Sequence, residues 1–104
     1  MSQASHRVEL LYFPDCPHWR VADERLREVA SRFGLTIEYR LVTTSEEADR
    51  VSFRGSPTIL IDGVDPFAVG DESIGLSCRI YRTSDGFAGS PTAGQIAAVL
   101  GSGG

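Results

Sequence analysis

Two cysteines and two histidines are the side chains with the strongest potential for chemistry in this sequence. Cys16 and His18 lie two positions apart in a Cys-Pro-His-Trp run, whereas Cys78 and His6 each stand alone. A thiolate is a nucleophile and an imidazole can transfer a proton, so the run at Cys16 indicates thiol chemistry. The spacing of the four residues does not match a zinc site, and we expect neither a metal site nor a cofactor.

Cys16 is predicted to lie at the start of a helix, because Pro17 suits the first helical position. Unpaired N–H groups and the helix dipole favour the thiolate form of a cysteine there. His18 supports this effect when it is protonated, and the negative charge of Asp15 opposes it. We expect Cys16 to be exposed and to react first with an alkylating reagent, with an inert cysteine as the alternative.

Cys78 is predicted to be a buried thiol. Residues 76–82 alternate as a strand, with Cys78 on one face beside Leu76 and Ile80 and with Arg79 on the other face. The predicted strand runs parallel to the first strand, which places Cys78 at the end of the sheet away from the other cysteine. We therefore expect no disulfide, and a small apolar role for Cys78.

The spacing of apolar residues predicts one domain of alternating strands and helices. Residues 7–13 are apolar on both faces, as in a central strand. Residues 35–42 alternate, as in an edge strand with Tyr39 and Leu41 on its buried face, and Gly34 ends the preceding helix. In order, the expected elements are strand 7–13, helix 17–33, strand 35–42, a helix 46–53 capped by Thr44 or Ser45, strand 58–61, a long loop 63–75, strand 76–82 and a helix to residue 100 capped by Ser90.

This order of elements and two motifs resemble the thioredoxin-like superfamily. The Cys-Pro-His-Trp run stands where that family has Cys-x-x-Cys, with Cys16 as the first cysteine and Trp19 in place of the second. The Ser-Pro-Thr run at 56–58 is similar to the segment in which the family holds a cis-proline, which makes Pro57 the candidate. The resemblance covers residues 7–100 and implies an α/β fold, β-α-β-α-β-β-α, with a mixed four-stranded sheet flanked by helices.

The resemblance implies a thiol–disulfide oxidoreductase with a single reactive cysteine. Because Trp19 cannot resolve a mixed disulfide, an external thiol must do so, either a low-molecular-weight thiol or a protein thiol or disulfide. The implied catalytic residues are Cys16, His18 and Pro57, and the implied substrate-binding residues are Trp19, Thr58 and Phe87. Whether the activity is retained stays open.

Two other functions also stay open. The groove around Trp19, Pro57 and Phe87 suits a non-catalytic module that binds a peptide or a protein. Soft-metal or organomercurial binding is the third possibility, because thioredoxin-like scaffolds also occur in alkylmercury lyases. Cleavage of a carbon–mercury bond needs paired thiolates with an acid, and only Cys16 and Asp15 are neighbours in the sequence.

The charge of the chain excludes partners that are held by basic patches. The net charge is −4, and all ten basic residues are arginines scattered along the chain. We therefore expect neither nucleic-acid binding nor membrane binding. No apolar run is long enough for a signal peptide or a membrane span, which predicts a cytoplasmic monomer with a disordered segment 1–6 and a flexible tail 101–104.

Overall fold

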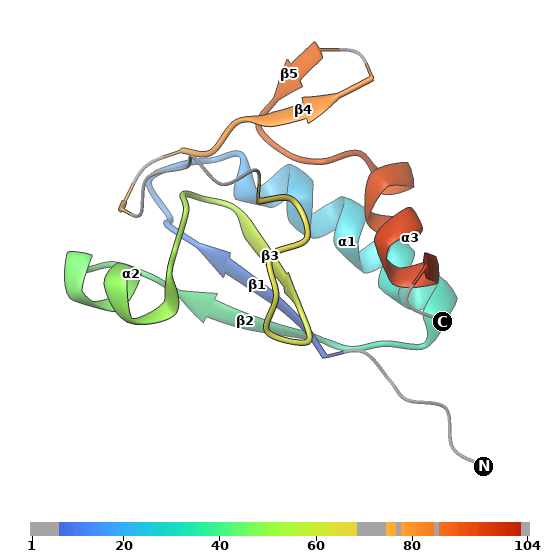
Figure 1. Cartoon of the computed structure of the whole chain (residues 1–104), viewed down its shortest axis with the longest axis horizontal. Coiled ribbons are helices and arrows are strands. Elements are labelled where there is room, and N and C mark those ends of the chain that lie inside the picture. The colour runs from blue at the N-terminus through green and yellow to red at the C-terminus, as the bar shows by residue number, and fades with distance from the viewer. Residues whose placement is uncertain (1–6, 69–74, 77, 85, 103–104) are drawn as a thin grey trace.

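The computed structural model describes residues 7–68, 75–76, 78–84 and 86–102. The expectations for residues 1–6, for part of the long loop (69–74), for Ser77 and Asp85, and for 103–104 lie outside the described residues. The described part contains three helices, a mixed three-stranded sheet and a second sheet of two strands (Figure 1). None of the helices in this part is long and apolar enough to cross a membrane.

The three-stranded sheet is built around β1 (Val8–Tyr12). β2 (Ile37–Leu41) pairs with one side of β1 in parallel, and β3 (Thr58–Ile61) pairs with the other side in antiparallel. The predictions of a central strand, an edge strand at β2 and a strand at β3 are confirmed. The chain leaves the end of β1 toward Cys16, so the position of this cysteine depends on the sheet.

Two apolar clusters cover the two faces of β1. On one face, β1 and β3 pack against α1 (Trp19–Phe33) and α3 (Ala93–Ser102). The buried residues of this cluster are Val8, Leu10, Ala22, Leu26, Val29, Ile59, Ile61, Ile96 and Leu100. On the other face, Leu11 packs with Val42, Phe53 and a residue of α2 (Ser45–Val51). Burial of each large side chain contributes about 1.5–3 kcal/mol, so both faces hold β1 in place.

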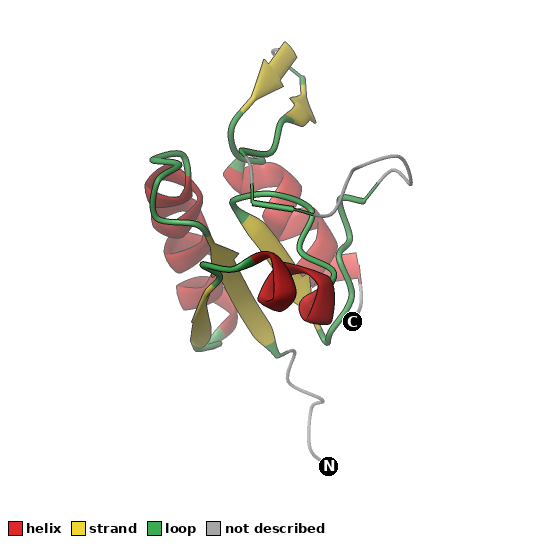
Figure 2. Cartoon of the chain, turned by 90° about the vertical axis from the view of Figure 1, so that its left-hand side faces the viewer, coloured by secondary structure: helices red, strands yellow, loops and turns green. Residues whose placement is uncertain are grey.

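The strand expected over residues 76–82 does not join the three-stranded sheet. β4 (Tyr81–Thr83) instead pairs in antiparallel with β5 (Gly86–Ala88), and the two form a hairpin that stands apart from that sheet (Figure 2). Before the hairpin, Cys78 makes an isolated parallel bridge with Ser56. The mixed sheet in the described part therefore has three strands, and the expectation of four is wrong.

The ends of the helices follow local hydrogen bonds. Thr44 caps α2, as predicted, and its Oγ1 accepts a hydrogen bond of 3.1 Å from the Glu47 backbone N–H. Gly34 ends α1 with φ 68°, also as predicted. The expected cap at Ser90 is wrong, because Thr92 caps α3 two residues later. The Thr92 backbone N–H donates a hydrogen bond of 2.9 Å to the Gln95 side-chain carbonyl, and the Gln95 backbone N–H donates one of 3.0 Å to the Thr92 hydroxyl.

β2 is more exposed than its alternating pattern predicts. Tyr39 and Leu41, expected on a buried face, are 48% and 47% exposed. The hydroxyl of Tyr39 donates a hydrogen bond of 2.6 Å to the Asp23 carboxylate on α1. The polar end of Tyr39 thus joins the helix to the edge of the sheet.

Replacement of this carboxylate, Asp23→Asn, is expected to lower the pKa of Tyr39. Partial burial, followed by the hydrogen bond and the negative charge of Asp23, together raise that pKa to about 12. A raised pKa means that protonated Tyr39 stabilises the fold below about pH 10, and that this contribution is lost as the pH rises through about 12. A rapid pH-jump titration of tyrosinate absorbance measures the change, and Tyr39→Phe identifies the signal. An unchanged titration in Asp23→Asn would show that burial alone holds the shift.

Candidate functional site

The two cysteines, which are 62 residues apart in the sequence, form a disulfide with a Cα–Cα distance of 5.7 Å. No described cysteine is free. This overturns the prediction that Cys78 lies at the far end of the sheet from Cys16 and that both are thiols. The physical reason is the path of residues 78–80, which run beside the loop before β3 instead of extending the sheet.

The exposures of the two cysteines are the reverse of those predicted. Cys16 is 1% exposed, whereas Cys78 is exposed. The backbone N–H of Cys16 donates a hydrogen bond of 3.0 Å to the Phe13 carbonyl, and its Sγ lies 3.7 Å from the Ser56 carbonyl oxygen. These contacts hold Cys16 beneath the surface, and the disulfide meets solvent on the side of Cys78.

The loop before β3 positions both halves of the disulfide. The Ser56 carbonyl accepts a hydrogen bond of 2.9 Å from the Arg79 backbone N–H, and the Ser56 hydroxyl accepts one of 3.0 Å from the Phe13 N–H. The Ser56–Pro57 peptide bond is cis, as predicted. The Pro57 carbonyl accepts a hydrogen bond from the Tyr81 hydroxyl. The loop therefore joins the end of β1 to the segment that carries the second cysteine.

A buried ion pair anchors the residue after Cys78. The guanidinium nitrogens of Arg79 lie 2.6 and 3.2 Å from the carboxylate oxygens of Asp65, and each of the two side chains is only 2% exposed. The guanidinium also lies 4.6 Å from the centre of the Tyr81 ring. Arg79 and Tyr81 thus face inward while Ile80 is 69% exposed, which reverses the predicted faces of this segment. A buried charge is tolerated only with a partner, and Asp65 provides it.

His18 lies beside the disulfide because residue 89 is a glycine. A Cβ on Gly89 would come within 2.4 Å of the His18 Cγ, so a larger residue would displace the imidazole. An open hollow of about 330 Å³ adjoins this place, and its lining includes Phe87, which is 73% exposed. The hollow is lined by His18, Cys78, Arg79, Ile80, Phe87, Ala88 and Gly89.

The other predicted site residues have structural contacts. Trp19 stacks on Tyr12 with ring centres 4.5 Å apart. Thr58 is 1% exposed and its hydroxyl donates to the Gly55 carbonyl at 2.6 Å, and the side chain of Pro57 is fully buried. The predicted residues that the fold brings to the disulfide are Cys16, His18 and Phe87, with Pro57 acting through its carbonyl. Sequence reasoning missed Asp65, Arg79 and Gly89.

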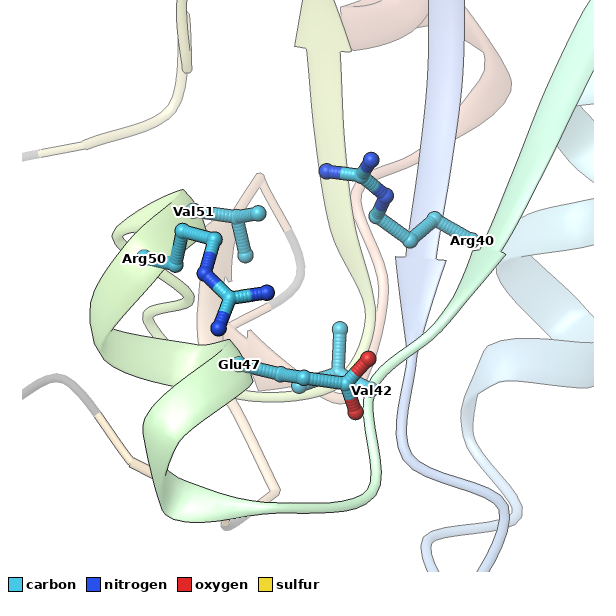
Figure 3. A pocket seen from close by; sticks show the side chains of 5 residues that line it. All are labelled: Arg40, Val42, Glu47, Arg50 and Val51. Carbon is cyan, nitrogen blue, oxygen red and sulfur yellow. The ribbon is translucent and has the colours of Figure 1, made fainter.

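A second, smaller hollow of about 80 Å³ lies between β2 and α2 (Figure 3). Arg40 and Arg50 reach over it from these two elements, and the Glu47 carboxylate lies at another side. A hydrogen bond from the Thr43 backbone N–H lowers the pKa of Glu47, which keeps its charge opposite the arginines. This hollow shares no lining residue with the one at the disulfide.

Comparisons with family models, with curated proteins and with solved structures find no match to this chain. Its described part is a small α/β unit with a mixed three-stranded sheet and a separate hairpin. The site joins a buried cysteine to an exposed cysteine beside an open hollow.

Proposed function

We propose that this protein is a thiol–disulfide oxidoreductase whose redox centre is the pair Cys16 and Cys78. The observation that carries the proposal is the disulfide with one exposed cysteine at the mouth of an open hollow. A purely structural cross-link needs no such access. The sequence resemblance to thioredoxin-like proteins supports the same class. Cys78 is the cysteine that forms the mixed disulfide, and the buried Cys16 takes the resolving role that the sequence assigned to an external thiol.

Exchange begins at Cys78, because it is the exposed partner. An incoming thiolate attacks the Sγ of Cys78, the new S–S bond forms, and the bond to Cys16 breaks. The electron pair leaves with the Cys16 sulfur, which becomes a thiolate. α1 begins three residues after Cys16, and the positive end of its dipole stabilises negative charge at that place.

The second half of the reaction releases the substrate. A second thiolate of the substrate attacks the substrate sulfur of the mixed disulfide, and Cys78 leaves as a thiolate. Two electrons pass from the substrate dithiol to the protein, and the two protons of the substrate thiols end on Cys16 and Cys78. An external small disulfide restores the protein disulfide by the same steps in reverse.

The walls of the hollow indicate the kind of thiol that fits. Ile80 and Phe87 are 69% and 73% exposed and flank Cys78, so they favour a protein thiol with apolar neighbours over a small charged thiol. The same apolar walls favour the second candidate function, a non-catalytic module that holds a peptide. The two differ in one respect, because only the oxidoreductase requires Cys78.

The test uses the folded protein and its two single-cysteine variants. Cys16→Ser leaves the exposed Cys78, and Cys78→Ser leaves the buried Cys16. With 5,5′-dithiobis(2-nitrobenzoate), we expect Cys16→Ser to form the mixed disulfide at least about tenfold faster, because access limits thiolate reactivity. When both variants are unfolded in urea, their rates of mixed-disulfide formation should become similar. This control shows that the difference in the folded state comes from access to the thiol and not from its intrinsic reactivity.

A second measurement separates a redox disulfide from a structural one. Dithiothreitol should reduce the wild-type disulfide without denaturant, at a rate far above that of global unfolding measured on the same sample. If reduction occurs only as fast as unfolding, the disulfide is a structural cross-link and the proposal fails. A folded Cys78→Ser variant that reacts as fast as Cys16→Ser would refute the order of the steps.

A further inference from the structure

The ligand atoms of Cys16, His18 and Cys78 lie within 4.8 Å of one another. The sequence spreads these residues without a zinc-like spacing, and the fold gathers them at the N-terminal end of α1. We propose that the reduced protein binds a thiophilic d¹⁰ metal ion such as Zn²⁺ through the two thiolates and the imidazole. This inference uses the cysteines of the proposed function but does not require thiol exchange with a substrate.

The donor set selects the class of ion. Thiolate sulfur and imidazole nitrogen are the preferred ligands of Zn²⁺, whereas Mg²⁺ and Ca²⁺ require oxygen ligands. Two cysteines and one histidine leave the fourth tetrahedral position free. His18 and Cys78 both line the hollow of about 330 Å³, so this position is open to a water or to a small anionic ligand.

The distances require only a small rearrangement. Zn–S bonds of about 2.3 Å and Zn–N bonds of about 2.0 Å place tetrahedral ligand atoms roughly 3.5 Å apart, within the present span of the three atoms. Once the S–S bond is broken, the two sulfur atoms must move apart to such a separation. Cys78 is the exposed partner and can make this movement, while Cys16 stays buried.

Gly89 keeps the imidazole in the site. Because a Cβ at position 89 would lie 2.4 Å from the His18 Cγ and 2.8 Å from its Cβ, a side chain there would force the whole histidine side chain away. Gly89→Ala therefore displaces the third ligand without changing any donor atom. This position gives a test of the site that is separate from removal of the ligands.

The metal and the disulfide exclude each other. Reduction by a dithiol adds two electrons and two protons to the cysteine pair, and Zn²⁺ then displaces those two protons. Oxidation by an external disulfide removes two electrons, forms the Cys16–Cys78 bond, releases Zn²⁺ and yields two small-molecule thiolates, which take up two protons from water. The ion is thus held only in the reduced state.

The experiment measures Zn²⁺ affinity by competition with a chromogenic chelator, with a phosphine reductant added to the reduced samples and omitted from the oxidised sample. We expect one Zn²⁺ per reduced wild-type chain and at least a hundredfold weaker binding by the oxidised protein. His18→Ala and Gly89→Ala should each weaken binding by about tenfold or more. His6→Ala, the matched control, should leave the affinity unchanged.

Co²⁺ provides a spectroscopic check on the same samples. The reduced wild type should show a thiolate-to-cobalt charge-transfer band with tetrahedral d–d bands, and Cys78→Ser should weaken the charge-transfer band. Equal Zn²⁺ affinity in the reduced and oxidised proteins, or unchanged affinity in both His18→Ala and Gly89→Ala, would overturn the inference. The redox proposal is judged by native-state reduction without metal, so the two can fail separately.

Discussion

Reduction of the Cys16–Cys78 disulfide is expected to lower the free energy of unfolding by about 4 kcal/mol. The bond closes a loop of 62 residues, which is more than half of the 104-residue chain. In the chain-entropy account, such a cross-link removes conformations from the unfolded state, and reduction restores them. The folded state is expected to change little, because Cys78 is not among the residues of either apolar cluster on β1.

Urea unfolding with and without a phosphine reductant measures this difference. The control is the double variant Cys16→Ala/Cys78→Ala. Its urea midpoint should equal that of the reduced wild type and should not change when the reductant is added. Equal midpoints for oxidised and reduced wild type would show that the unfolded chain gains no freedom on reduction. A domain of this size has a total stability of about 5–15 kcal/mol, so the reduced form is expected to stay folded, as thiol exchange and metal binding both require.

Elements that depend on local signals were predictable from the sequence. β1 and β2 follow from the two-sided and one-sided apolar patterns, and Gly34 and Thr44 mark helix ends by backbone conformation and by a side-chain hydrogen bond. The start of α3 also carried a readable signal. Thr92 followed three residues later by Gln95 is a capping box, which marks the helix start better than Ser90 does.

The segment around Cys78 could not be predicted, because its faces depend on a distant partner. The alternation was recognised, but alternation alone does not say which set of side chains is buried. Arg79 was assigned to the face opposite the buried Cys78, whereas an ion pair with Asp65, in a loop of unpredicted shape, buries it. That reversal turns Cys78 outward, and the departure from the sheet brings it to Cys16.

The site was therefore predicted in part. Cys16 and His18 followed from the motif, and Phe87 from the resemblance to thioredoxin-like proteins. Cys78, the cysteine that forms the mixed disulfide, was missed because its segment was assigned to the sheet. The role of Gly89 depends on a contact with His18 across 71 residues, which no local pattern encodes.

Replacement of Arg79 by methionine is expected to lower the free energy of unfolding by about 3 kcal/mol, the lower end of the range for breaking a buried ion pair. Methionine preserves most of the buried volume, but it leaves the Asp65 carboxylate, 2% exposed, without its closest cation. Arg54, at 3.6 Å, and the Phe67 backbone N–H, at 3.0 Å, still contact that carboxylate, which limits the loss. Urea unfolding of the oxidised protein gives the value.

Arg54→Met is the matched control, because it removes the other cation from the same carboxylate. The Arg54 side chain is 30% exposed and its contact is longer, so the expected cost is below about 1 kcal/mol. The double variant Asp65→Asn/Arg79→Met, which buries no charge, should recover part of the loss. Because the Arg79 side chain anchors the residue next to Cys78 to Asp65, Arg79→Met should slow re-formation of the disulfide after reduction, whereas Arg54→Met should not. If the two single variants are equally stable, or the double variant is no better than Arg79→Met, the buried charge is not what fixes Cys78 beside Cys16.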